Sequence, residues 1–137
     1  INMKDQDLER TRVLLRGWGN WSHNNTGCHW YTQMCGLSNV LPVAPDLRYK
    51  LCDDDALVID KLVACMMDEE NPRPMTFFVL HYVHGLNKSE IARRATREDK
   101  KQCTEGKVRS LLLLMESMVC GMLIQREQMG FRLEYDK

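Results

Sequence analysis

Residues 77–123 read FFVLHYVHGLNKSEIARRATREDKKQCTEGKVRSLLLLMESMVCGML, and this stretch decides the fold. It opens with an apolar, aromatic-rich run over 77–83 that is typical of a buried helix. Gly85 follows, and glycine commonly ends a helix because it adopts the left-handed conformation without steric cost. Asn87 or Ser89 is then predicted to cap a second, shorter helix, since both side chains can accept a hydrogen bond from free backbone amides.

The second helix is predicted over 89–96, and its small Ala92 allows another helix to cross closely. A polar stretch follows, after which Thr104 is predicted to cap a third helix. That helix carries apolar residues at helical spacing, namely Val108, Leu111, Leu112 and Met115. Helix, glycine turn, short helix, polar turn and long helix is the order of a sigma-like helix-turn-helix.

Basic residues gather around the two later helices. Between positions 88 and 109 there are four acidic residues and eight basic ones. The basic residues are Lys88, Arg93, Arg94, Arg97, Lys100, Lys101, Lys107 and Arg109. Such side chains can neutralise phosphates, which provides the sequence-independent part of DNA affinity. The alternative interpretation is a charged, solvated face on an ordinary helical domain.

The predicted DNA-binding residues divide by the role that their position favours. Recognition helices present their N-terminal residues to base edges, which selects Thr104, Glu105, Lys107, Arg109 and Ser110. Lysine and arginine can donate to guanine, and glutamate can accept from cytosine. Phosphate contacts need charge but little geometry, which selects Arg93, Arg94, Arg97, Lys100 and Lys101, with Lys88 beside them.

The whole chain is predicted to be all-α, a compact helical domain of five or so helices over residues 3–137. An N-terminal helical part covers 3–72 and the helix-turn-helix part covers 73–128. A helix over 5–21 should bury Trp18 and Trp21, and 28–51 should be irregular. We expect a core containing Leu57, Ile59, Leu62, Val63, Phe78, Tyr82, Val83, Ile91, Val108, Leu111 and Leu112.

Charge is balanced overall but unevenly distributed. The chain has 19 basic and 19 acidic residues, so it is not a generally basic nucleic-acid binder. Residues 44–72 hold eight acids against three bases, and this acidic middle beside a basic C-terminal half indicates two surfaces with different partners. A strong helix is preceded by Asp53, Asp54 and Asp55. Their carboxylates are predicted to cap it, because the positive end of the helix dipole stabilises negative charge. A metal site is the less favoured alternative, because adjacent side chains point apart.

The six cysteines are scattered without a CxxC pair, which indicates an intracellular, reduced protein. The sequence shows neither a signal segment nor an apolar run of membrane-spanning length, so no membrane partner is expected. His23, Cys28, His29 and Cys35 have the side chains of zinc ligands, but buried thiols are the favoured interpretation. No metal, no cofactor and no catalytic residue is predicted, because no motif of catalysis is present.

Three motifs in this order and spacing resemble the late-gene antitermination protein Q family of lambdoid bacteriophages. They are LRGWGNW at 15–21, LCDDDALVID at 51–60 and LHYVHGLNKSEI at 80–91, and the similarity covers about Glu9 to Met122. Ser89, Ile91 and Ala92 match the first helix of the family's helix-turn-helix. The start of its recognition helix is matched by Cys103, Thr104, Val108 and Leu112.

The resemblance implies a transcription factor that binds double-stranded DNA in the phage late promoter, within the cytoplasm of the bacterial host. It implies that the protein engages a paused, sigma-bearing host RNA polymerase near the RNA exit channel, so that polymerase reads through pauses and terminators. The family passes from the Ile-Ala pair to the recognition-helix valine in about eleven residues, whereas Ile91 to Val108 is seventeen. The extra residues lie in 97–102, as a protruding basic loop or as an extension of the preceding helix.

Two other functions compete with antitermination. One is a repressor or activator that uses the same helix-turn-helix without a stable polymerase-bound role. The other is a helical protein-interaction domain that binds no nucleic acid. The acidic helix before residue 70 and the tryptophan-rich helix favour antitermination, since a simple repressor needs no such N-terminal half.

Overall fold

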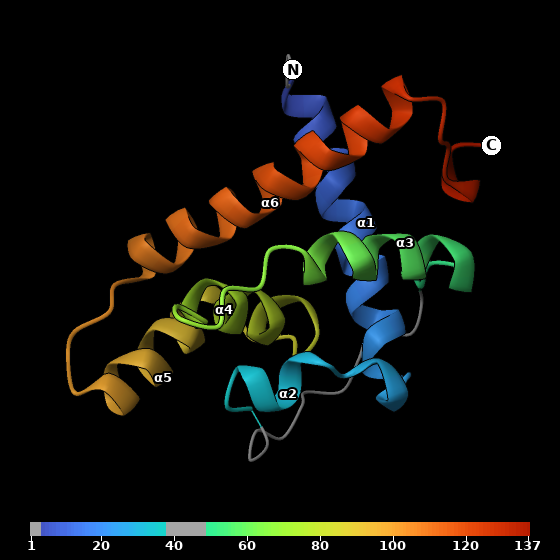
Figure 1. Ribbon diagram of the computed structural model, residues 1–137. Coiled ribbons are helices and arrows are strands. Elements are labelled where there is room, and N and C mark those ends of the chain that lie inside the picture. Colours follow the sequence, from blue (N-terminus) through green and yellow to red (C-terminus); the bar gives the residue numbers. More distant parts are fainter. Residues whose placement is uncertain (1–3, 38–48) are drawn as a thin grey trace.

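The computed structural model describes residues 4–37 and 49–137, and in these residues the chain is helical without strands (Figure 1). The α-helices are α1 (Asp5–His23), α2 (Tyr31–Met34), α3 (Asp53–Ala64), α4 (Arg73–Tyr82), α5 (Lys88–Asp99) and α6 (Glu105–Gln128). Two short 3₁₀ helices, η1 (Thr26–Cys28) and η2 (Glu134–Asp136), complete the described elements. The predicted all-α class is confirmed. Of the region expected to be irregular, 28–51, residues 38–48 lie outside the described residues, and the described part includes the short helix α2.

Helices α1 and α6 are central to the packing: α1 contacts α3, α4 and α6, and α6 also contacts α3, α4 and α5. Trp18 is fully buried and Trp21 is nearly so, which confirms both as core residues. The Trp18 ring lies 6.4 Å from the Tyr31 ring and 5.9 Å from the Phe78 ring, centroid to centroid. This aromatic cluster joins α1, α2 and α4.

The acidic residues of α3 hold the tryptophans. The Nε1 atoms of Trp18 and Trp30 donate to the same Asp60 oxygen, at 3.1 Å and 3.2 Å. Trp21 Nε1 donates to Asp53 at 2.9 Å. A buried indole N–H needs a hydrogen-bond acceptor, and these carboxylates of α3 provide it to the tryptophans. The prediction that these aspartates cap α3 is therefore incomplete. Asp53 lies in the first turn, but α3 has no side-chain cap hydrogen bond.

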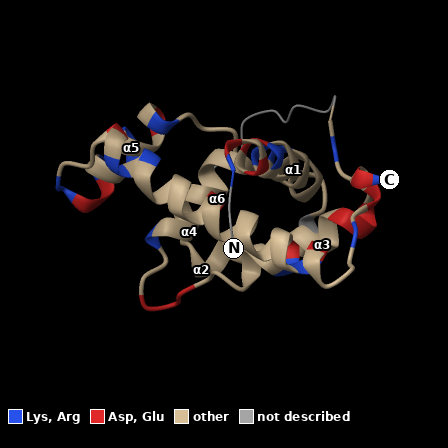
Figure 2. Cartoon of the chain, turned by 90° about the horizontal axis from the view of Figure 1, so that it is seen from above, with Lys and Arg blue, Asp and Glu red and all other residues tan. Residues whose placement is uncertain are grey.

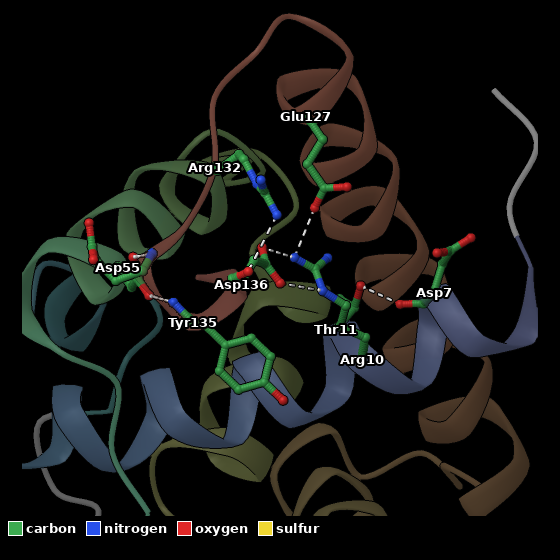
Figure 3. A network of polar contacts seen from close by, with 9 residues as sticks. Asp7, Arg10, Thr11, Asp55, Glu127, Arg132, Tyr135 and Asp136 are labelled. Carbon is green, nitrogen blue, oxygen red and sulfur yellow. Dashed lines mark hydrogen bonds and ion pairs between the residues drawn. The ribbon is translucent and has the colours of Figure 1, made fainter.

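The buried Asp55 fastens the end of the chain to α3 (Figure 3). Its carboxylate accepts from the backbone N–H groups of Glu134 and Tyr135, at 2.8 Å and 2.9 Å. Arg10 of α1 forms an ion pair with Asp136 of the same C-terminal segment. The segment is therefore held by two helices, α1 and α3. Because both Asp55 oxygens are taken by amides, this carboxylate serves packing rather than metal binding.

Most of the predicted core is confirmed, with one error. The buried members are Ile59, Val63, Phe78, Tyr82, Val83, Ile91, Val108 and Leu112, whereas Leu62 and Leu111 are partly buried. Leu57 is 43% exposed, so its prediction as core is wrong. Helix α3 buries one face at Ala56, Ile59 and Val63, and a residue one position from Ala56 is turned about 100° away from that face.

The last three helices have the predicted order, and their caps can be assigned. Of the two candidate caps, it is Asn87 that caps α5: its side chain accepts from Glu90 N at 2.9 Å. Helix α5 extends to Asp99, three residues beyond the predicted end, and Lys100 follows with φ of 52°. Half of the extra residues, 97–99, therefore lengthen α5, and the other half, 100–102, lie in the turn that follows. Thr104 caps α6 as predicted, because its hydroxyl accepts from Lys107 N at 3.1 Å.

Helix α6 contains a longer apolar segment than the sequence analysis predicted. It contains an 18-residue window with mean hydropathy 1.5, which is long and apolar enough by composition to span a membrane. The expectation that no segment has this character is therefore corrected. In this fold 39% of the window is buried, and its buried face packs on α1, α4 and α5 as the core helix of a domain does.

Shortening a core side chain of the α5–α6 pair should destabilise the protein. Ile91→Ala or Leu112→Ala is expected to cost about 2–5 kcal/mol, because each side chain is at most 1% exposed and leaves a cavity. Urea unfolding measures the loss. Leu57→Ala is the control and should cost under about 0.5 kcal/mol. Equal losses in all three variants would contradict the packing described.

Stability is expected to fall as the pH is lowered through the histidine range. Burial lowers the pKa of His84 from its ordinary 6.5, and the nearby His23, His29 and Arg94 lower it further. Burial likewise lowers the pKa of His81. The unfolded chain then binds protons more readily, so stability is fully present above about pH 6.5 and is lost below it.

Urea midpoints at about pH 7.5 and about pH 5.5 measure this effect. The decrease should shrink in the double variant His81→Gln/His84→Gln, whose side chains do not titrate in this range. A wild-type protein that is equally stable, or more stable, at the lower pH would contradict it.

Candidate nucleic-acid interface

Helix α5 and the first turns of α6 form one end of the molecule, away from the C-terminus (Figure 1). The turn between them, 100–104, is pinned to α5 by Thr96. The Thr96 hydroxyl accepts from Cys103 N at 2.9 Å and lies within hydrogen-bond distance of the carbonyls of Ala92 and Cys103. Cys103 is itself buried, so the turn is anchored by its own thiol side chain. The start of α6 therefore has a fixed position relative to α5.

The first turns of α6 leave one face free. Gly106, Lys107 and Ser110 are exposed on it, while Val108 and Leu112 pack inward. The hydroxyl of Ser110 donates to the Gly106 carbonyl at 3.0 Å. The predicted base-contacting residues Lys107 and Ser110 thus share one exposed surface. Thr104 is exposed beside them, with its hydroxyl engaged in capping.

Four of the predicted phosphate-contacting residues surround the turn. The residues Arg93, Arg97, Lys100 and Lys101 are all exposed. Figure 2 shows that positions of Lys and Arg occur along α5. The two arginines line a shallow groove of about 390 Å³ together with Gln102. We call Arg93, Arg97, Lys100 and Lys101 the turn bases. They lie beside the start of α6, as residues that hold the backbone beside a base-reading helix would.

The other predicted residues lie on different sides. Arg94 faces α4 and pairs with Glu98 at 2.7 Å, and both line a cavity that also contains Arg73. Arg109 pairs with Glu105 at 3.0 Å, so these two candidate base contacts are engaged with each other. The structure therefore does not bring all eleven predicted residues onto one face.

Lys88 and Arg109 lie together in a second place, a cleft of about 350 Å³ between α1 and α6. Two residues of α1 that the sequence analysis did not select, Arg12 and Arg16, line the same cleft. Their spacing of four residues places them on one face of a helix, a signal visible in the sequence. We call Arg12, Arg16, Lys88 and Arg109 the basic cleft.

The residues with zinc-ligand side chains make other contacts. The ring of His23 hydrogen-bonds the Val83 carbonyl through Nδ1, and the ring of His29 hydrogen-bonds the Ser22 carbonyl through Nε2. Burial raises the pKa of the Cys35 thiol, which disfavours the thiolate that zinc binds. Within residues 4–37 and 49–137, no three His, Cys, Asp or Glu side chains are placed to hold a metal ion.

Elemental analysis tests the prediction that the protein needs no zinc. Protein purified without chelator is expected to contain well under one zinc per chain, and its thermal midpoint should not change on adding a chelator. Stoichiometric zinc that is lost in Cys28→Ser or Cys35→Ser would contradict the prediction.

These features define a small all-helical protein with exposed basic residues at the turn between α5 and α6. A family model, Phage antitermination protein Q, matches residues 9–130. The chain therefore belongs to the phage antitermination protein Q family, a family of phage transcription antitermination factors, as its three motifs indicated.

Similar proteins agree with this assignment. A probable antitermination protein Q of Acyrthosiphon pisum secondary endosymbiont phage 1 is 32% identical over 90% of this chain and 78% of its own length. The antitermination protein Q of Escherichia phage 933W is 31% identical over 92% of this chain and 81% of its own. The solved structure of transcription antitermination factor Q21, a selenomethionine derivative, shares the fold with TM-score 0.67. It is 19% identical and covers 95% of this chain and 97% of that one.

Proposed function

We propose that this antitermination factor binds double-stranded DNA of a phage late promoter through α5 and α6. From there it engages sigma-bearing host RNA polymerase near the RNA exit channel and makes it read through pauses and terminators. The protein acts in the cytoplasm of the bacterial host, where that polymerase works. Family membership supports antitermination, and the DNA and polymerase contacts are the proposed mechanism.

The observation that carries the DNA contact is the exposed end formed by α5, the turn and the start of α6. Its free face presents Lys107 and Ser110, and the turn bases flank it. The formal net charge of the chain is zero, so this local excess of positive charge is not a by-product of a basic protein. A fixed helix N-terminus flanked by exposed bases is the arrangement with which helix-turn-helix proteins enter the major groove.

In the N-terminal half, several acidic residues hold the fold together, while others stay exposed. Asp53, Asp55 and Asp60 are engaged in hydrogen bonds with indoles or backbone amides. Trp18 and Trp21 are buried. The polymerase contact must therefore use other residues, and the exposed acids at 68–70 between α3 and α4 remain available for it.

Transcription with purified components tests the proposal. Host polymerase with sigma factor is started from the late promoter on a template with a downstream terminator. Added protein is expected to increase the fraction of transcripts that pass the terminator. A matched template with a scrambled promoter-proximal region is the control and should show no increase.

Two outcomes would contradict the proposal. If the protein binds the promoter and changes initiation without altering termination, it is a repressor or activator. If read-through rises equally on the scrambled template, polymerase binding alone is sufficient and the DNA contact is not needed.

A further inference from the structure

The basic cleft lies between elements that are distant in the sequence. Arg12 and Arg16 come from α1, Lys88 begins α5, and Arg109 lies in the second turn of α6. Its floor contains Glu116 of α6, which is buried and accepts a hydrogen bond from the Tyr82 hydroxyl. The cleft is therefore built by the packing of α1 and α4 against α6.

Two of the four bases are paired with carboxylates. Arg12 Nε donates to Glu116 at 3.2 Å, and Arg109 donates to Glu105 at 3.0 Å. In the part of the chain that the structure describes, neither Arg16 nor Lys88 makes an ion pair. The positive charges of both residues affect His81 in the cleft. Burial lowers the pKa of His81, and Lys88 and Arg16 lower it further. The cleft thus has positive charge left for an anion.

The position of the cleft on α6 favours a particular anion. Glu105 and Arg109 are four residues apart, which is about 6 Å along a helix, and the major groove is about 12 Å wide. If the first turn of α6 lies at the centre of the groove, Arg109 lies near its edge. The phosphates of the DNA backbone line that edge. A cleft that begins at Arg109 and continues toward α1 would then meet the backbone.

We propose that the basic cleft binds a backbone phosphate of the same DNA duplex that α6 enters, with Arg16 and Lys88 as its principal contacts. This inference rests on the proposed function and extends it to α1. It also changes the role of Arg109, which becomes a residue of the groove edge instead of a base reader. The N-terminal helix is then part of the DNA-binding surface and not only its support.

Single-stranded RNA is the less suitable occupant of this cleft. Proteins bind single strands by stacking bases on exposed aromatic rings. Of the two rings that line the cleft, Tyr82 is 8% exposed and its hydroxyl is bound to Glu116. The other, His81, is partly buried, packs against the Tyr82 ring at 4.8 Å and hydrogen-bonds the Leu86 carbonyl. The cleft offers charge without a stacking surface, which suits a duplex backbone.

The test is titration of the full chain with promoter duplex, scrambled duplex and single-stranded RNA of equal length, at several salt concentrations. Arg16→Ala and Lys88→Ala should each weaken both duplexes to the same extent. Each should also make the salt dependence shallower by about one unit of slope. Lys61→Ala on α3, which also removes one exposed positive charge, should change neither quantity.

A variant that adds positive charge to the cleft separates an effect on binding from a loss of binding caused by misfolding. Leu113 lines the cleft and is 43% exposed, so Leu113→Lys should fold normally and steepen the salt dependence by about one unit. Met118→Lys is its control, since Met118 is equally exposed but about 20 Å from the start of α6. It should have no effect on the slope.

The outcomes separate this inference from the function on which it rests. If the wild-type chain shows no salt-dependent duplex binding, both fail. If it binds duplex but Arg16→Ala and Leu113→Lys leave the slope unchanged, the cleft alone is refuted. If RNA binds more tightly than either duplex and Arg16→Ala abolishes only that binding, the cleft is an RNA site and the inference is also overturned.

Discussion

Gly19→Ala is expected to abolish folding. Gly19 lies within α1, where a Cβ atom would stand 1.9 Å from the carbonyl oxygen of Tyr82 and 2.6 Å from its carbonyl carbon. Both are backbone atoms at the end of α4, so no side-chain rotation can relieve the overlap. The two helices would have to separate, and the core around Trp18 would separate with them. We expect a loss of more than about 5 kcal/mol, which is the whole stability of a marginally stable domain.

Gly121→Ala is the matched control, because it makes the same change within α6. Nothing lies within 4 Å of the position where its Cβ would be. The variant should be more stable by about 0.5–1 kcal/mol, since alanine favours the helical state over glycine. Circular dichroism and urea unfolding report both variants. A folded Gly19→Ala protein with near wild-type stability would contradict the close approach of α1 and α4.

The second large effect concerns DNA affinity. The triple variant Arg93→Ala/Arg97→Ala/Lys101→Ala removes three of the turn bases, all exposed. Each lost phosphate contact lowers the salt slope by about 0.9, so affinity near 0.1 M salt should fall by roughly two to three orders of magnitude. Lys100 is left in place, so that the residue with φ of 52° at the end of α5 is unchanged.

A charge-matched variant makes this result interpretable. Lys50→Ala/Lys61→Ala/Lys137→Ala removes the same charge from exposed positions around α3 and the C-terminus, which lie on the other side of the molecule from α5 (Figure 2). Its DNA affinity should stay close to wild type. Equal losses in the two triple variants would show that binding follows net charge and not the turn.

Features determined by neighbouring residues could be predicted from the sequence. Asn87 and Thr104 cap helices through amides three residues away, and Gly85 ends the α4 segment with φ of 76°. Such signals are readable because caps and glycine stops act within one helical turn. They gave the order of the last three helices and the all-α class. The end of α5 was missed, since the polar residues at 97–99 are compatible with helix or loop.

Features determined by distant pairing could not be predicted. Asp55 looked like a cap, but it binds amides 79 and 80 residues further along the chain. Asp60 accepts hydrogen bonds from two indoles that other elements bring to it, and no local pattern in the sequence indicates this pairing. Arg16 became a candidate only because α1 packs against α6, which places Arg16 in the cleft that Lys88 and Arg109 also line. Local patterns carry no information about which helices meet, so these roles required the fold.

The most direct test of the account is terminator read-through by the two triple variants. In transcription with purified polymerase on a late-promoter template, the turn variant Arg93→Ala/Arg97→Ala/Lys101→Ala should lose read-through while the charge-matched variant retains it. Both should have thermal midpoints close to wild type, because all six residues are exposed. Full read-through by a folded turn variant would contradict the claim that this antitermination factor acts through DNA held at the α5–α6 turn.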